Sequence, residues 1–395
     1  MPLGIYISVP FCRTKCSYCN FASDVFSRAV FERYVDRVCA DIQKAPQTSA
    51  EMRGQLERAV DSIYLGGGTP TVLEAAQLER VFAMVRQQFE VSADAEVTVE
   101  CAPGTLTPAM LETLLRCGVN RVSLGVQSFV DQEAAAVGRL HKRETVLADI
   151  ARLRAAGITN MNIDLIAGLP HQTAESWKFS LAEAIASGAS HVSVYMLEVD
   201  EDSRLGSELL AGGTRYHARF VPDEESMADF YIVACERLQS AGIAQYEISN
   251  FARENFESRH NLKYWKRLPY FGFGVDAHSM LASTTPDIEA VRFAPADSLE
   301  RYMSNAALQR TAVSHSAALE ESFFLGLRLT QGVSLRELSA RFGDDAINQP
   351  RIVIPELVED GLMQYRGDVA SLTSRGRLVS NEVFERFILT EESVR

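Results

Sequence analysis

Short apolar strands and amphipathic helices alternate about six times between Ile5 and Leu197. Residues 31–42, for example, carry apolar side chains at helical spacing, whereas residues 62–65 form a short apolar run. This alternation favours a parallel sheet with helices outside it. The connections are short enough for right-handed βαβ units, so we expect an α/β fold with a partial, TIM-like parallel (β/α)6 barrel.

The pattern predicts the individual elements of this first half. Strands are expected at residues 5–9, 62–65, 96–100, 121–126, 161–166 and 191–197. Helices are expected between them at residues 31–42, 74–89, 108–117, 144–156 and 176–187. Polar residues gather at the carboxyl ends of these strands, which is the edge where barrels form their sites.

The second half is less regular. We expect a helix at residues 222–240, a strand at 245–249 and a turn at 283–286. Towards the end of the chain, two short helices (334–341 and 352–359), a hairpin (362–372) and a last helix (374–387) resemble a winged-helix domain. The chain is therefore divided into residues 1–300, the barrel with its sites, and residues 301–395, a winged-helix-like domain.

Charge and composition exclude several classes of function. The net charge is −13, and acidic residues also surround the winged-helix-like part, so nucleic-acid binding is disfavoured. No apolar run approaches the roughly 18 residues of a membrane span, which leaves only peripheral membrane contact open. No signal peptide is visible. The seven cysteines do not resemble a disulfide framework, so a reducing cytoplasm is expected.

Three of those cysteines form a tight cluster directly after the first strand. Cys12, Cys16 and Cys19 have the spacing C-x3-C-x2-C, which can gather three thiolates into one soft-metal site. Structural zinc usually takes four protein ligands, and no fourth Cys or His lies nearby in sequence. A [4Fe-4S] cluster held by three cysteines would leave one iron open for another ligand. A disulfide or three unrelated cysteines are the alternatives.

This loop resembles the cluster loop of radical S-adenosylmethionine (SAM) proteins, in which SAM chelates the open iron. The resemblance extends to Gly-Gly-Gly-Thr-Pro at 66–70, whose backbone would hold the SAM amino group, and to an acidic strand end that would accept ribose hydroxyls. Each signal alone also fits a tight turn or an exposed charge. The SAM-contacting residues implied by the resemblance are Tyr6, Tyr18, Gly67, Gly68, Thr69, Glu100, Gln127, Arg139 and Asp164.

Residues 6–388 further resemble the oxygen-independent coproporphyrinogen III dehydrogenase family and its relatives. Dehydrogenases of that family carry another cysteine where this chain has Phe21, and they have a longer amino-terminal segment. In both departures, and in the motif H-N-x-x-Y-W at 260–265, the chain resembles the HemW-type haem chaperones. The resemblance implies haem binding, with His260 and Tyr264 on one helix face as candidate contacts and His278 as a second choice. A core aromatic cluster with a satisfied histidine is the alternative.

We therefore expect a [4Fe-4S] protein that binds SAM and haem and delivers haem to an acceptor protein. The alternative is a dehydrogenase that uses SAM radical chemistry to decarboxylate porphyrinogen propionates oxidatively, which would also need an electron donor. Whether the chain is an enzyme stays open, with the chaperone favoured. Surface histidines such as His217 and His315 are expected to have no role.

Overall fold

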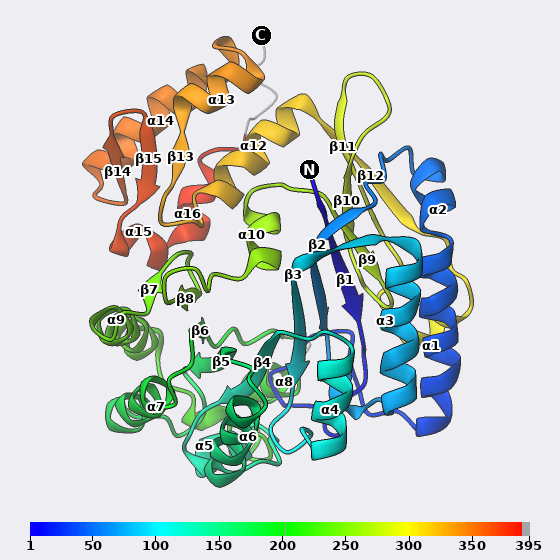
Figure 1. Cartoon of the computed structure of the whole chain (residues 1–395). Helices are drawn as coiled ribbons and strands as arrows, with labels where there is room; N and C mark the ends of the chain where they lie inside the picture. The colour runs from blue at the N-terminus through cyan, green and yellow to red at the C-terminus, as the bar shows by residue number, and fades with distance from the viewer. Residues whose placement is uncertain (202, 389–395) are drawn as a thin grey trace.

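The computed structural model describes residues 1–201 and 203–388, and its centre is a mostly parallel sheet (Figure 1). Six consecutive strands pair in parallel with their neighbours along the chain. They are β1 (Leu3–Ser8), β2 (Ala59–Gly66), β3 (Glu90–Cys101), β4 (Arg121–Gln127), β5 (Asn160–Ala167) and β6 (His191–Met196). Each coincides with a strand expected from the sequence, which confirms the α/β repeat.

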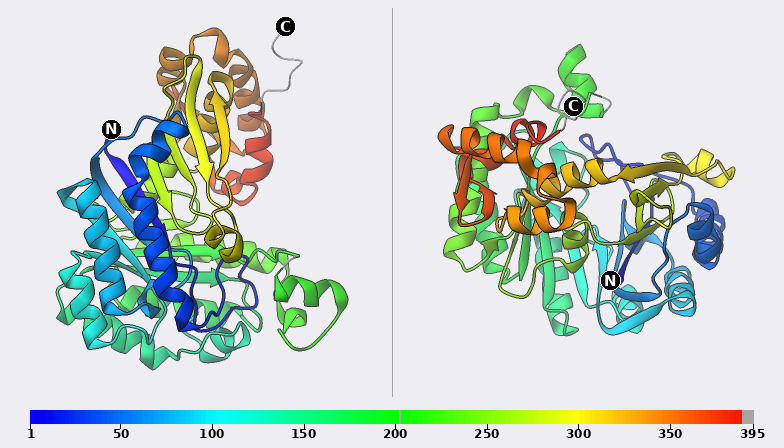
Figure 2. Two further views of the ribbon diagram at one scale, coloured as in Figure 1. Left: turned by 90° about the vertical axis from the view of Figure 1, so that its right-hand side faces the viewer. Right: turned by 90° about the horizontal axis from the view of Figure 1, so that it is seen from above.

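Helices cover the outer face of these strands, as Figures 1 and 2 show. They are α1 (Arg28–Gln43), α2 (Ala45–Glu51), η1 (Pro70–Val72), α3 (Ala75–Gln88), α4 (Pro108–Arg116), α5 (Asp131–Ala136), α6 (Arg143–Ala155), α7 (Ala174–Ala186) and α9 (Glu224–Ser240). Their apolar stripes bury residues such as Val35, Leu78 and Trp177 against the strands. No helix in the described part of the chain has both the length and the apolarity needed to cross a membrane.

The sheet continues beyond the six-fold repeat at both edges. On one side β9 (Tyr270–Phe273) pairs in parallel with β1, and β10 (Ser279–Ala282), β11 (Ile288–Ala294) and β12 (Gln309–Ser314) follow in antiparallel pairing, with α11 (Leu299–Met303) between the last two. On the other side β8 (Asn250–Ala252) pairs with β6, and β7 (Ala244–Gln245) pairs with β8.

The single strand expected at residues 245–249 is wrong. The chain turns back at Glu247, which separates β7 from β8. The carboxylate of Glu247 is fully buried and accepts a hydrogen bond from the backbone N–H of Ser249 at 3.0 Å. It also accepts one from the side chain of Asn250. A local side-chain acceptor thus replaces the ladder partners of a continuous strand.

The carboxyl-terminal unit has the expected winged-helix character, with a three-stranded antiparallel sheet in the order β13-β15-β14. Its elements are α12 (His315–Gly326), β13 (Val333–Ser334), α13 (Leu335–Phe342), η3 (Asp345–Ile347), α14 (Asn348–Glu359), β14 (Met363–Arg366), β15 (Val369–Leu372), α15 (Ser374–Leu378) and α16 (Ser380–Glu385). The last expected helix is therefore broken, at Val379. Because β12 still belongs to the large sheet, the pairing favours a division near Ser314 over the predicted 300/301. Residues 389–395 of the predicted domain lie outside the described part.

A buried ion-pair cluster joins the two units. Glu321 on α12 binds the guanidinium of Arg267 at 2.8 Å and that of Arg292 at 2.6 Å. Glu321 and Arg267 are both almost fully buried. Removing one member of such a cluster leaves a buried charge without its partner, which is far more harmful than breaking an exposed pair.

We predict that Glu321→Ala lowers the free energy of unfolding by about 3 to 5 kcal/mol, because the Arg267 guanidinium is left buried and unpaired. Denaturant unfolding of the full chain measures this change. As a control, Asp297→Ala breaks an exposed pair with Arg301 and should change stability by less than about 1 kcal/mol. Equal effects of the two substitutions would contradict the assignment.

Candidate functional site

Three loops emerge side by side at the carboxyl edge of the sheet because β1 lies between β2 and β9. Ser8 pairs with Gly66, and Ile7 pairs with Phe273, so the chain leaves all three strands at the same level. The first loop, residues 9–27, holds the three predicted cluster ligands, and we call it the cysteine loop. The second is the glycine loop, residues 66–70, and the third is residues 274–278. This register explains why residues that follow different strands meet at the carboxyl edge of the sheet.

The glycine loop packs directly on the cysteine loop. The N–H of Val9 donates to the carbonyl of Gly66 at 2.8 Å, and the N–H of Thr69 donates to that of Phe11 at 2.9 Å. A Cβ atom on Gly68 would lie 2.5 Å from the carbonyl oxygen of Val9. Gly67 has a φ of +86°, a conformation that favours glycine. The glycines therefore serve the approach of two backbone segments, as well as any approach by a ligand.

The three cysteines lie close to one another on the cysteine loop. Cys16 is buried, whereas Cys12 and Cys19 are partly exposed, and all are free thiols. The hydroxyl of Thr69 lies 3.9 Å from the sulfur of Cys12, and that of Ser23 lies 3.9 Å from the sulfur of Cys19. Burial raises the pKa of both the Cys12 and Cys16 thiols. Binding of a cation, which requires thiolates, must therefore release protons.

The three thiols of the cysteine loop suit the irons of a [4Fe-4S] cluster. A single zinc ion would need each sulfur about 2.3 Å from one point. An iron–sulfur cluster instead places each thiolate on a different iron, so its cysteines are spread around a larger body. Three free, neighbouring thiols on one loop meet that requirement.

Glu100, at the end of β3, faces the glycine loop. Its carboxylate accepts hydrogen bonds from the backbone N–H of Gly67 at 3.1 Å and from the Tyr64 hydroxyl at 2.8 Å. Burial, and secondarily the nearby Asp164 carboxyl, raise the pKa of Glu100 to about 7. A Cβ on Gly67 would lie 2.9 Å from the Tyr6 hydroxyl, so Tyr6 also belongs to this group. Tyr64 was not predicted from the sequence; its signal was the strand register, since Tyr64 pairs directly with Tyr6.

A second group of predicted residues surrounds Arg139. One guanidinium nitrogen of Arg139 donates to the Tyr18 hydroxyl at 3.0 Å, which ties it to the cysteine loop. Its Nε is buried and has no hydrogen-bond partner in the described part of the chain. Burial alone would lower the pKa of Arg139. Electrostatic attraction to Tyr18 and Cys16, together with the hydrogen bond to Tyr18, is larger, so the pKa of Arg139 is raised. Gln127 ends β4 with a φ of +67° and lies beside the same guanidinium across Gly125. An unsatisfied buried donor here indicates a missing acceptor.

Asp164 lies on β5 and is held by side chains of its own and the neighbouring strand. Its carboxylate accepts hydrogen bonds from Ser123 at 3.0 Å and from Asn162 at 2.7 Å. Burial raises its pKa, and these hydrogen bonds oppose the increase. The structure therefore brings together the Tyr6, Gly67 and Glu100 group, with Asp164 as its electrostatic neighbour. The Tyr18, Gln127 and Arg139 group lies along the same edge of the sheet.

The structure places His260 and Tyr264 elsewhere. They lie on α10 (Arg259–Trp265), at the amino ends of the strands, where Lys263 binds the carbonyl of Pro2 (Figure 1). His260 is 1% exposed, and its two ring nitrogens contact Ser62 at 3.1 Å and Tyr264 at 2.9 Å. Burial lowers its pKa to about 3. This is the satisfied core histidine of the alternative interpretation, and it counts against His260 as a haem ligand.

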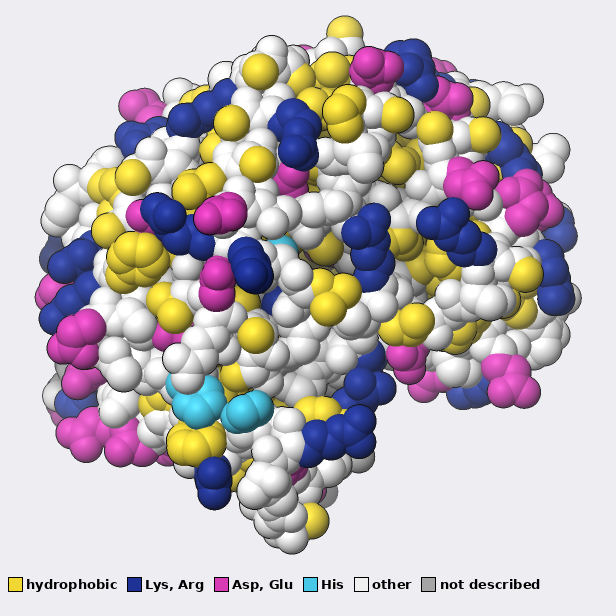
Figure 3. Space-filling view, turned by 90° about the horizontal axis from the view of Figure 1, so that it is seen from below, with side chains coloured by type: hydrophobic (Ala, Val, Ile, Leu, Met, Phe, Trp, Pro, Cys, Tyr) yellow, Lys and Arg dark blue, Asp and Glu magenta, His cyan; other side chains and the backbone are white. Residues whose placement is uncertain are grey.

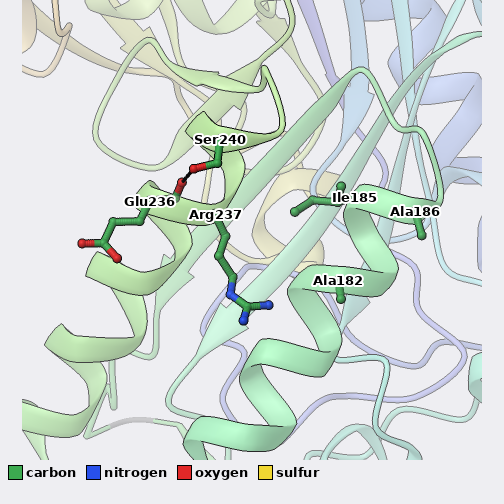
Figure 4. A pocket seen from close by; sticks show the side chains of 6 residues that line it. All are labelled: Ala182, Ile185, Ala186, Glu236, Arg237 and Ser240. Carbon is green, nitrogen blue, oxygen red and sulfur yellow. Dashed lines mark hydrogen bonds between the residues drawn. The ribbon is translucent and has the colours of Figure 1, made fainter.

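An open hollow of about 490 Å³ lies on the outer side of the barrel, between α7 and α9 (Figure 4). Ala182, Ile185 and Ala186 supply its apolar wall, and Glu236, Arg237 and Ser240 line the other side. None of the predicted site residues contributes to it. The hollow is a groove between two surface helices and is separate from the candidate site.

Comparison with known proteins agrees with this geometry. The family model for the radical SAM superfamily matches residues 6–183, and that for the HemN C-terminal domain matches residues 313–379. Heme chaperone HemW of Bacillus subtilis (strain 168) is 34% identical, covering 97% of this chain and 98% of the relative. Heme chaperone HemW of Escherichia coli (strain K12) is 30% identical, covering 98% of each chain.

Among solved structures, coproporphyrinogen III oxidase (HemN) from Escherichia coli has the same fold, with a TM-score of 0.81 and 24% identity. The match covers 98% of this chain and 90% of that structure. The fold and the cysteine loop together define a protein of the radical SAM superfamily. Since relatives at least 30% identical match it along almost its whole length, the chain belongs to the HemW family of haem chaperones.

We predict that Gly68→Ala displaces the cysteine loop, because its Cβ would be 2.5 Å from a backbone oxygen that cannot rotate away. Overpacking of this kind costs about 1 to 3 kcal/mol. Iron and sulfide content after anaerobic reconstitution should fall at least severalfold. The matched control is Gly157→Ala, which adds backbone strain at a φ of +85° but meets no atom within 4 Å. Undiminished iron content in Gly68→Ala would refute the packing argument.

Glu100 should make stability depend on pH. Its folded-state pKa of about 7 exceeds the ordinary value of 4.5, so the folded chain holds this proton more tightly than the unfolded chain. The free energy of unfolding should therefore fall as pH rises from about 4.5 to about 7, by an amount on the order of 3 kcal/mol. In Glu100→Gln this contribution is absent. Denaturant unfolding of both proteins between pH 4.5 and 8 measures the difference, and parallel curves would contradict the prediction.

Proposed function

We propose that this chain is a haem chaperone that carries a [4Fe-4S] cluster on Cys12, Cys16 and Cys19, binds SAM beside it, and delivers haem to an acceptor protein. The observation that carries the proposal is the convergence of the cysteine loop, the glycine loop and Glu100 on one edge of the sheet. Membership of the HemW family supplies the haem-carrying part.

The chain's own residues would divide the work of holding SAM. Gly67, Gly68 and Thr69 present backbone groups for its amino group, and Glu100 offers oxygens to the ribose hydroxyls. The unpaired Nε of Arg139 is suited to a carboxylate. When bound, the cluster supplies an iron atom that SAM can ligate and a centre that can accept or give one electron.

The position of Phe21 supports the chaperone over the dehydrogenase. Its ring is 67% exposed on the cysteine loop, where dehydrogenases of the related family carry a further cysteine. A phenyl ring has no thiol chemistry, but it is an apolar contact that a porphyrin or a partner protein can cover.

The partners follow from the same chemistry. Haem and a haem-accepting protein are required by the proposal, and an electron donor is required only if the cluster is reduced. All seven cysteines lie in the described part of the chain and are free, which suits a reducing compartment such as the cytoplasm.

The proposal predicts two separate binding reactions of the full chain. Anaerobic reconstitution with iron and sulfide should give about four irons per chain in the wild type, and Cys12→Ser, Cys16→Ser and Cys19→Ser should each lose most of this iron. Haemin titration, followed at the Soret band, should show saturable binding. As a control, Cys235→Ser, distant in sequence and partly buried on α9, should behave as wild type in both assays.

Two outcomes would reject the proposal. A wild-type protein that holds zinc or no metal after anaerobic preparation would remove the cluster. Conversion of coproporphyrinogen III to protoporphyrinogen IX by the reconstituted protein with SAM and a reductant would identify a dehydrogenase instead.

A further inference from the structure

Two histidines hydrogen-bond to each other at the carboxyl edge of the sheet. His171 lies in the loop after β5, and its Nε2 is 3.1 Å from Nδ1 of His217. His217 directly precedes η2 (Ala218–Phe220), in the connection between β6 and α9. Figure 3, which views the molecule from below, shows two histidine side chains next to each other on this face. The pair was not expected from the sequence, since 46 residues separate its members.

Both histidines are held in a left-handed backbone conformation, with φ values of 68° and 62°. Non-glycine residues adopt it rarely, and such positions concentrate at functional sites. The backbone N–H of His171 donates to the carbonyl of Phe220 at 2.9 Å, which fixes the two segments together. Glu208 supports the other side, because its carboxylate accepts from the N–H groups of Tyr216 at 2.7 Å and Ala218 at 3.1 Å.

Flat aromatic and cationic groups surround the pair. The ring of Phe220 is 4.2 Å from that of His171 and 40% exposed. The guanidinium of Arg219 lies 4.6 Å from the Phe220 ring, and that of Arg215 lies 5.3 Å from the Tyr216 ring. We call His171 together with residues 215–220 the histidine platform. The adjacent α8 (Arg204–Ala211), which contacts η2, exposes two further apolar side chains, Leu209 and Leu210.

We propose that the histidine platform binds haem, with Nε2 of His217 as an axial ligand of the iron. This inference rests on the proposed haem-carrying function and locates its site. In the described part of the chain, nothing hydrogen-bonds to Nε2 of His217, whereas its Nδ1 is engaged by His171. A ligating imidazole characteristically donates its other ring N–H to an acceptor, so His171 is the positioning residue.

The chemistry of the platform selects haem over a bare metal ion. Zinc sites have three or four protein ligands, whereas the platform offers two imidazoles, one of which is hydrogen-bonded to the other. Haem brings four nitrogen ligands of its own and needs only one or two from the protein. Its porphyrin face suits Phe220 and the exposed leucines, and its two propionates suit the guanidinium groups of Arg215 and Arg219.

The connection between β6 and α9, which carries the platform residues 215–220, is also bonded to the cysteine loop. The N–H of Leu205, at the start of α8, donates to the carbonyl of Ser17 at 2.8 Å, and Ser17 lies between Cys16 and Cys19. Asn20 of the cysteine loop donates to the carboxylate of Asp200 at 3.0 Å. The segment that carries His217 thus contacts the loop that would carry the cluster.

The test is a haemin titration of the full chain under anaerobic conditions. His217→Gly suits its left-handed backbone, so the variant should fold. We expect it to lose the spectrum of imidazole-ligated haem and to bind haemin at least tenfold more weakly, and added imidazole should restore the spectrum. The control His315→Ala removes an exposed histidine that pairs with Glu289, and it should match wild type.

His171 is tested by affinity and rescue. His171→Ala should keep the imidazole-type spectrum but bind haemin about 10- to 100-fold more weakly, the usual effect of losing such an outer partner. His171→Gln, whose amide oxygen can accept from Nδ1–H of His217, should recover most of the affinity. Loss of affinity in both variants would reject the positioning role.

The outcomes separate the two proposals. If the wild type shows no saturable haemin binding, the proposed function fails. If the wild type binds and His217→Gly keeps its affinity and spectrum, the platform is rejected while the proposed function stands. A His260→Phe variant that folds but loses the imidazole spectrum, while His217→Gly retains it, would likewise reject the platform in favour of α10.

Discussion

The close packing of the glycine loop on the cysteine loop is the contact on which the site depends. Gly68 has no side chain, and this lets the backbone of residues 66–70 pass within contact distance of Val9 and Phe11. The same approach brings Thr69 beside the sulfur of Cys12 and aims the N–H of Gly67 at Glu100. A displacement of either loop would therefore separate Thr69 from Cys12 and Gly67 from Glu100 together. The three cysteines are thus positioned by backbone contacts more than by their own side chains.

Inside the barrel, Glu100, Tyr64 and His260 form a chain of contacts that runs from the carboxyl edge towards the amino ends of the strands. Tyr64 donates to Glu100, and its ring is 5.4 Å from that of His260 at the other end of the strands. Next to Tyr264, Trp265 lies 4.3 Å from the guanidinium of Arg328, beyond α12 in the carboxyl-terminal unit. The motif at 260–265 therefore fills the amino end of the barrel and joins it to the second unit. Its histidine has a structural explanation that does not need a ligand.

How much the sequence predicted depended on how local each signal was. The six central strands are short apolar runs bounded by Gly or Pro, so local pattern was sufficient to predict them. Strand β9 is four residues long and pairs with β1 from the far end of the chain, so no local pattern identifies it. The turn at Glu247 was missed because a side-chain hydrogen bond, from the N–H of Ser249 to the Glu247 carboxylate, supports it. The break at Val379 is a change of backbone conformation at one residue, with φ of −117° and ψ of 35°.

The candidate site was predictable to the same degree. Cysteine spacing and strand-end positions indicated the residues at the carboxyl edge, and the parallel register explains why they meet. The spacing of His260 and Tyr264 correctly placed both on one helix face, where they hydrogen-bond. Spacing does not say which way that face points, and here it points into the core. The pair of His171 and His217 could not be predicted from spacing, because only the folding of two separate loops brings their rings together.

The two ends of the barrel therefore differ in what they can do. At the amino end, His260 of α10 is engaged by hydrogen bonds to Ser62 and Tyr264, and Lys263 forms an ion pair with Asp61 at 2.7 Å. At the carboxyl edge, the ring of Phe220 is exposed, and the buried Nε of Arg139 has no hydrogen-bond partner in the described part of the chain. The hydrogen bond between α8 and the cysteine loop is a route by which a ligand on this loop could act on the segment that carries His217. Such a ligand can change haem affinity only if it binds the two arrangements of that segment unequally, and the effect must then be reciprocal. A chaperone needs this property, since it must hold haem in one state and release it in another.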